Sequence, residues 1–211
     1  MCGRYQAWVE DDEIVRILEI EKRGSAEEYL RQDEVTPGTV QPVLYGSAVK
    51  IRAHLSLWGV RLMPEEGKTG RFLINVRAET AAEKSRFRPA FAPADGARAG
   101  DGVHADRRAA VAASGYYEWR DGIRYRIEPE MGGTLYLGAL EIGAPAEKGA
   151  GNPGRRHLIL TTSARGEIAR VHSRMPLFLL REELDDWLYD PVFARRRLLG
   201  EWVIPMRVEA G

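Results

Sequence analysis

The fold is decided by a stretch in the middle of the chain, Ala109–Ile142, which reads AAVAASGYYEWRDGIRYRIEPEMGGTLYLGALEI. Three segments in it are rich in apolar and aromatic residues, namely Ala109–Trp119, Ile123–Ile127 and Thr134–Ile142. Connections that contain glycine or proline separate them, which is typical of β-strands that follow one another along the chain. The stretch therefore predicts consecutive strands rather than strands that alternate with helices.

Segments on either side extend this pattern. Further strands are predicted at Val49–Leu57, where apolar and polar residues alternate, at Phe72–Val76 and at His157–Thr162. Helices are predicted near the two ends of the chain, at Asp11–Arg23, Gly166–His172, Arg181–Tyr189 and Pro191–Leu199. Loops are expected at Thr36–Gly38, Ala92–Asp106 and Gly143–Gly154. This order predicts an α+β fold with a largely antiparallel, barrel-like sheet and a few flanking helices.

Length and composition narrow the class of protein. The 211 residues suffice for a single domain, expected over residues 1–211 with a peripheral tail from about residue 200. No apolar run approaches the roughly 20 residues that span a bilayer, and the first residues do not resemble a signal peptide, so a cytoplasmic protein without a membrane partner is expected. The formal net charge is zero, yet 26 of the 31 basic residues are arginine. Arginine suits phosphate binding, although a GC-rich genome produces the same bias.

The chain has a single cysteine, and it stands at position 2. One cysteine excludes a disulfide within the chain and a cysteine-based zinc site. The histidines show no HExxH or comparable spacing, so neither a metal nor another cofactor is expected. A lone cysteine is usually a small buried hydrophobic residue, but a chain terminus is a poor place for core packing.

Cys2 acquires a distinctive chemistry once Met1 has been removed. Its free α-amine, with a reference pKa of about 7.7–8.0, can form a Schiff base with an aldehyde. Its thiol can then add to the imine carbon and close a five-membered thiazolidine ring. The same N-terminal cysteine also suits the nucleophile of an amidohydrolase. The first residues alone leave these two readings, and a cysteine without a role, open.

Four other segments carry polar or aromatic residues whose neighbours in the sequence indicate a functional role. Asn75 and Arg77 share one face of a predicted strand. Glu118 lies among aromatic residues, where a desolvated carboxyl can act as a general acid or base. His172, which can exchange protons, precedes Arg174 by two residues. Trp58 precedes a glycine and, if exposed, could stack on a base. Each segment alone also fits an ordinary strand, loop or core residue.

Taken together, these segments resemble the SOS response-associated peptidase family, also called abasic-site processing proteins. Six short motifs occur in the family's order, from the initiator methionine to about residue 180. They are Met1–Tyr5, Thr36–Thr39, Trp58-Gly59, Asn75–Thr80, Gly115–Trp119 and His172–Pro176. Each motif is weak alone, but the ordered set is specific.

The resemblance implies covalent capture of abasic sites in single-stranded DNA by Cys2 through a thiazolidine, with Met1 removed by the protein itself or by an aminopeptidase. It implies that Asn75, Glu118 and His172 assist Cys2, by positioning the amine or the sugar and by proton transfer. It further implies DNA contacts from a second set of residues, with phosphates held by arginines, a wall for stacked bases and a backbone contact. That set is Arg4, Pro37, Trp58, Arg77, Thr161 and Arg174. A monomer that associates with the nucleoid when it binds DNA is expected.

The chain departs from the family pattern at three points. Val60–Pro64 lacks the second tryptophan expected after Trp58-Gly59, and serine replaces an acid at Ser114 and at Ser173. These changes alter the expected stacking wedge and remove negative charge near the expected DNA path. The leading hypothesis is a DNA-crosslinking enzyme with lyase-type Schiff-base chemistry. An N-terminal-cysteine peptidase or amidohydrolase and a non-covalent sensor of single-stranded DNA are the alternatives.

Overall fold

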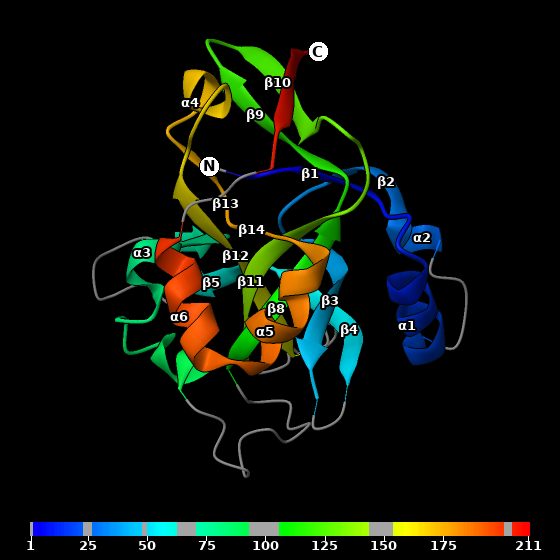
Figure 1. Cartoon of the computed structure of the whole chain (residues 1–211), viewed down its shortest axis with the longest axis vertical. Helices are drawn as coiled ribbons and strands as arrows, with labels where there is room; N and C mark the ends of the chain where they lie inside the picture. The colour runs from blue at the N-terminus through cyan, green and yellow to red at the C-terminus, as the bar shows by residue number, and fades with distance from the viewer. Residues whose placement is uncertain are drawn as a thin grey trace.

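The computed structural model describes residues 2–22, 27–47, 50–62, 71–92, 106–143, 154–200 and 204–211. The chain forms a closed β-barrel with a five-stranded sheet over one end and helices packed against its side (Figure 1). The α+β fold with a barrel-like, largely antiparallel core is therefore confirmed. Among the described residues, no helix combines the length and the apolar character needed to cross a membrane.

Five strands close the barrel, in the order β12-β4-β3-β8-β11, because β11 also pairs with β12. Their bounds are β3 Val40–Gly46, β4 Ile51–Trp58, β8 Arg107–Ala113, β11 Leu135–Gly143 and β12 Arg155–Ser163. The short strands β7 (Asn75–Arg77), β13 (Arg174–Pro176) and β14 (Phe178–Leu179) extend it at its edges. All pairings are antiparallel except those of β12 with β4 and with β7, which are parallel.

The second sheet has the order β15-β10-β9-β1-β2. Its strands are β1 Tyr5–Trp8, β2 Arg31–Val35, β9 Gly115–Arg120, β10 Ile123–Pro129 and β15 Met206–Ala210, and a separate hairpin pairs β5 (Val60–Leu62) with β6 (Arg71–Leu73). The tail beyond residue 200 thus contributes an edge strand, β15, whose side chains are largely exposed.

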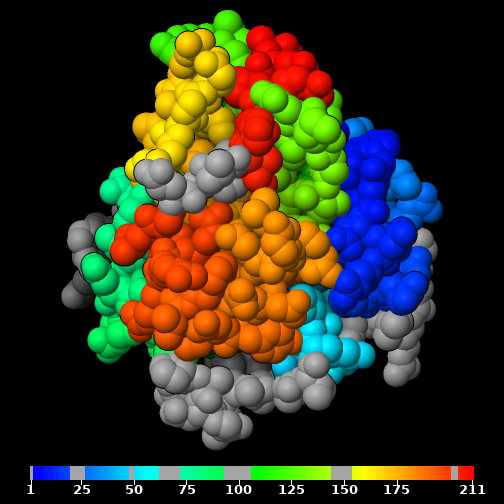
Figure 2. Space-filling model, viewed as in Figure 1, coloured from blue at the N-terminus to red at the C-terminus, as the bar shows by residue number. Residues whose placement is uncertain are grey.

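Helices cover the outside of the barrel, and α5 and α6 lie side by side on the face shown in Figure 2. The helices are α1 Asp12–Lys22, α2 Glu27–Leu30, α3 Ala78–Ala81, α4 Ile168–Val171, α5 Leu184–Tyr189 and α6 Pro191–Leu199, with 3-10 turns at Arg88–Phe91 and Arg181–Glu183. Asp11 begins α1 by accepting hydrogen bonds from the backbone of Glu13 and Ile14, both at 3.1 Å. Trp187 anchors α5 because its indole N–H donates to the carbonyl of Ala109 on β8, at 2.9 Å.

The barrel strands are buried on both faces. On β11, Leu137 and Ala139 point into the barrel and join an inner apolar cluster, whereas Tyr136 and Leu140 join an outer cluster beneath the helices. The inner cluster continues into the five-stranded sheet through Tyr5 and other residues of β1, β9 and β10. One apolar core therefore joins the barrel interior to the sheet that covers its end.

The far end of the barrel interior is polar. Glu141 on β11 is 1% exposed and contacts the ring of His54, Nε of Arg107 at 2.7 Å and Nη1 of Arg155 at 3.4 Å. The polar side chains of β4, which alternate with its apolar ones, thus face this ion network inside the barrel. His54 on β4 therefore belongs to this network through its contact with Glu141.

Two predicted strands are each divided. Ala109–Trp119 breaks at Ser114, where the chain leaves the barrel as β8 and enters the second sheet as β9. Phe72–Val76 breaks at Ile74, whose carbonyl accepts hydrogen bonds from the Trp58 indole and the Ile159 backbone. In both cases the strand changes partners, which periodicity within one segment does not reveal.

Most other predicted elements are confirmed, with shifted ends. The turn at Thr36–Gly38, the short helix after Gly166 and the two helices after Arg181 are all present. Arg23, Gly24, Val49 and most of the two long predicted loops lie outside the described residues.

Candidate functional site

Cys2 lies where the barrel interior meets the covering sheet. Its side chain is fully buried and belongs to the same apolar cluster as Tyr5, Trp58 and Tyr116. Burial raises the pKa of its thiol, and the negative charge of Glu118 raises it further. A neutral thiol is therefore the resting form, so a base must take its proton before the sulfur can attack.

Asn75 holds the backbone of Cys2. It is the first residue of β7 and is placed by the parallel pairing of that strand with β12. Its Nδ2 donates a hydrogen bond to the carbonyl of Cys2 at 2.8 Å, and its buried Oδ1 has no partner among the described residues. A carbonyl can only accept, so the amide orientation is fixed and Oδ1 is left as an acceptor beside the cysteine.

Glu118 approaches the same region from β9. Successive residues of a strand point to opposite faces, so Glu118 and Tyr116 share one face while Tyr117 and Trp119 share the other. Glu118 is 4% exposed, and its charge acts on the pKa of both the Cys2 thiol and the Tyr116 hydroxyl. Three of the four residues predicted to act together, Cys2, Asn75 and Glu118, are thus gathered from β7, β9 and the start of the chain.

His172 ends α4 and is half-buried. Its Nδ1 accepts a hydrogen bond from the backbone N–H of Arg174 at 2.9 Å and also lies 3.2 Å from the Arg174 carbonyl oxygen. Arg174 begins β13, and Met175 of that strand packs in the apolar cluster that contains Cys2. His172 therefore directly precedes a strand that contributes Met175 to the apolar cluster of Cys2.

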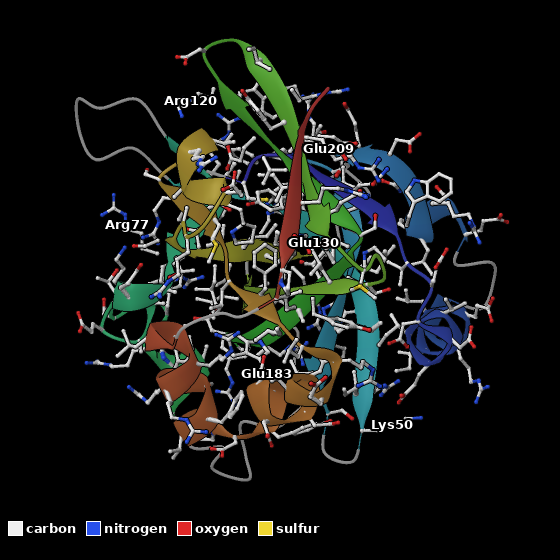
Figure 3. All side chains as sticks on the ribbon, turned by 45° about the horizontal axis from the view of Figure 1, so that its top comes forward. Lys50, Arg77, Arg120, Glu130, Glu183 and Glu209 are labelled. Atoms are coloured by element: carbon white, nitrogen blue, oxygen red, sulfur yellow. The ribbon has the colours of Figure 1, made fainter. Side chains whose placement is uncertain are left out.

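The three predicted phosphate-binding arginines have different surroundings. Arg77 is exposed, and Figure 3 shows its guanidinium projecting away from the ribbon. Arg4 pairs with Glu34 at 3.2 Å and lies 5.2 Å from the ring centroid of Trp119. Arg174 donates to both carboxylate oxygens of Glu79, at 2.7 and 2.8 Å, and also contacts the Thr161 carbonyl. Arg77 therefore presents its cation to solvent, whereas the charge of Arg174 is already paired.

Two predicted DNA contacts do not fit the structure. Trp58 is fully buried, its indole N–H donates to the Ile74 carbonyl at 3.1 Å, and its ring packs 5.2 Å from that of Tyr5, so it cannot form the base-stacking wall. Thr161 is also fully buried and cannot touch the DNA backbone as predicted. Both residues point inward because the barrel closes over them.

The neighbourhood of Trp58 explains its glycine. Gly59 has a φ of +102°, and a Cβ added to it would lie 2.5 Å from the Phe72 ring. Pro37, another predicted wall residue, is half-buried in the turn before β3.

Trp119 is an exposed aromatic side chain to which the sequence alone assigned no role of its own. It is 40% exposed, and Arg4 lies over its ring. The sequence did carry a signal for this exposure. Trp119 follows Glu118 on a strand, so its side chain points to the face opposite that of the Glu118 side chain. Within the described ranges, no group of three or more His, Cys, Asp or Glu side chains is placed to hold a metal ion.

Solved structures share this architecture. A protein from Bacteroides thetaiotaomicron superposes with a TM-score of 0.69 at 19% identity, over 99% of this chain and 91% of that one. A phage-related protein from Bordetella bronchiseptica gives a TM-score of 0.66 at 22% identity, over 100% and 94%. At these identities the likeness concerns the fold.

Sequence comparisons reach further. The chain is 27% identical over 197 residues to the abasic site processing protein YoqW of Bacillus subtilis, covering 89% of this chain and 80% of the relative. It is 26% identical over 212 residues to YobE of the same species, which carries the same description, covering 94% and 89%. The model of the SOS response associated peptidase family matches residues 1–203, and the chain belongs to that family.

Proposed function

We propose that this protein processes abasic sites in DNA by forming a covalent thiazolidine between Cys2 and the ring-opened sugar. The observation that carries the proposal is the anchoring of Cys2 by Asn75, with Glu118 acting on its thiol. The names of the relatives YoqW and YobE supply the substrate class. Removal of Met1 is a condition, because only a free α-amine can become an imine nitrogen.

The proposed reaction has two stages. The neutral amine of Cys2 attacks the sugar aldehyde to give a carbinolamine, whose hydroxyl takes up a proton and leaves as water, so that an iminium ion remains. The Asn75 Oδ1 accepts a hydrogen bond from the amine, which directs its lone pair, and His172 exchanges protons with the sugar oxygen. Glu118 then takes the thiol proton, the sulfur attacks the iminium carbon, and the C=N π electrons return to nitrogen as the ring closes.

We place single-stranded DNA along the surface near Arg77, Arg4 and Trp119. The exposed guanidinium of Arg77 suits a phosphate, and the half-exposed indole of Trp119 offers a face for an unstacked base. Pro37 is retained as a wall for the bases on the strength of the family motif alone. Arg174 would contact a phosphate only by giving up part of its pairing with Glu79.

A denaturing gel tests the proposal. Mature protein, with Met1 removed, is incubated with single-stranded DNA that carries one abasic site, and a second sample uses the same DNA with an intact base. We expect a shifted band that survives heating with the abasic DNA alone, because the thiazolidine is covalent. Absence of that band, or hydrolysis of a peptide amide without DNA, would overturn the proposal and favour an N-terminal-cysteine peptidase.

A further inference from the structure

The Tyr116 hydroxyl is a buried polar group with no assigned role. The side chain is fully buried on β9, and its hydroxyl has no hydrogen-bond partner among the described residues. An unpaired hydroxyl in a protein interior costs folding free energy, and such a group calls for an explanation. Phenylalanine would fill the same space without that cost, so the hydroxyl needs another reason to be there.

The surroundings of Tyr116 suggest that reason. Tyr116 pairs directly across from Tyr5 in the antiparallel ladder of β9 and β1, and both rings pack in the apolar cluster that contains Cys2. Two residues further along β9, on the same face, lies Glu118. Tyr116 therefore shares an apolar cluster with the nucleophile and a strand face with its proposed base, and its side chain is fully shielded from solvent.

The charge state of the phenol is fixed by the same surroundings. Burial raises the pKa of Tyr116 well above its ordinary value, and negative charge on Cys2 or Glu118 raises it further. The phenol thus stays protonated and acts as a hydrogen-bond donor. The nearby groups that can become anionic acceptors are the Cys2 sulfur and the Glu118 carboxylate, while Tyr5 is likewise held neutral by burial and by Cys2.

We propose that Tyr116 is a positioning residue for ring closure, and that its hydroxyl donates a hydrogen bond to the Cys2 sulfur as Glu118 removes the thiol proton. The bond would stabilise the thiolate in an apolar pocket and aim it at the iminium carbon. No atom is transferred from Tyr116, because the thiol proton goes to Glu118 and the new C–S bond uses the sulfur's lone pair. This inference rests on the proposed function for its reaction, but not for its effect on the thiol.

Tyr116→Phe tests the proposal, with Tyr117→Phe as the matched control. Tyr117 is the next residue on the same strand, points to the opposite face, and has Arg124 over its ring at 5.0 Å. Both changes remove one hydroxyl and keep the ring. In mature Tyr116→Phe protein we expect borohydride-trapped imine to form within about twofold of the wild-type rate, while conversion to the heat-stable product slows roughly 10- to 100-fold.

A second measurement needs no DNA. Cys2 is the only cysteine of the chain, so iodoacetamide addition followed by intact mass reports its thiol alone. The rate of alkylation plotted against pH should shift to higher pH in Tyr116→Phe and stay unchanged in Tyr117→Phe, because the stabilising donor is lost only from the former. Thermal stability of Tyr116→Phe should equal or exceed that of the wild type.

The outcomes separate the two proposals. If wild-type protein forms no crosslink but the alkylation profile of Tyr116→Phe shifts, the proposed function fails while the positioning role survives. If the crosslink forms and Tyr116→Phe closes the ring and alkylates as the wild type does, the positioning role is overturned. A loss of thermal stability, with imine and stable product reduced equally, would also overturn it in favour of a packing role.

Discussion

Mature Cys2→Ala protein should form no heat-stable crosslink with abasic single-stranded DNA. The variant keeps an N-terminal amine after Met1 is removed, so it can still form an imine. It lacks the sulfur that closes the ring, and an imine returns to amine and aldehyde in water. We therefore expect the band on the denaturing gel to disappear completely, and to reappear only as a product trapped by borohydride.

The control for Cys2→Ala is binding and folding. The side chain is buried and small, so its truncation should lower thermal stability only modestly, and Arg77 and Arg4 should still bind single-stranded DNA with the same salt dependence. A heat-stable band in Cys2→Ala without borohydride would contradict ring closure by the sulfur. Loss of both imine and DNA binding would show instead that the variant no longer folds.

Glu141→Gln should be the most damaging single substitution for stability among those considered. The carboxylate is 1% exposed and lies against His54, Arg107 and Arg155, whose side chains are themselves largely shielded from solvent. Removing it leaves two guanidinium groups inside the barrel end without their counter-charge. We expect the free energy of unfolding to fall by about 3–5 kcal/mol, measured by urea denaturation at pH 7.

The pH dependence of that loss has a definite sign. Burial acts to raise the pKa of Glu141, but the hydrogen bonds and charges of His54 and Arg107 outweigh it and lower the pKa from 4.5 to about 2. The carboxylate's contribution is therefore fully present above about pH 4.5 and is lost as pH falls toward 2. The gap in stability between wild type and Glu141→Gln should narrow over that range.

Glu13→Gln is the matched control, because Glu13 also pairs with an arginine, Arg181, but is 64% exposed. Its loss should change the free energy of unfolding by no more than about 1 kcal/mol. An equal effect of the two substitutions at pH 7 would contradict the account of Glu141 as the counter-charge of a buried network.

The elements that periodicity reveals were predictable from the sequence. The amphipathic spacing of Ile14 and Leu18 predicted α1, and the apolar run ending at Ile142 predicted β11. A barrel-like core was predicted, but the strands that close it were not, because closure depends on β12 meeting both β4 and β11 across long separations in the chain. The short strands β13 and β14 were also not predicted, because two or three residues are too few to show a periodic pattern of apolar residues.

The candidate site was predicted unevenly for the same reason. Cys2, Asn75 and Glu118 carry their reactive or polar groups whatever the fold. The ordered motifs allowed the inference that these three residues act together. The exposure of Trp58 could not be inferred, because alternation along β4 distinguishes two faces but not which of them is covered. Here the barrel interior covers one face and helix α1 packs against the strand from outside, so Trp58 is core, whereas Trp119 on β9 is exposed.

The mass of the crosslinked N-terminal peptide tests the central claim most directly. The crosslink is formed without borohydride, treated with iodoacetamide, digested with nuclease and protease, and analysed by mass spectrometry. We predict a peptide that begins at Cys2, carries the abasic sugar with loss of one water, and has no alkylated thiol, because the sulfur is in the ring. A sugar attached to a lysine, a peptide that retains Met1, or an adduct whose Cys2 is alkylated would contradict the thiazolidine account.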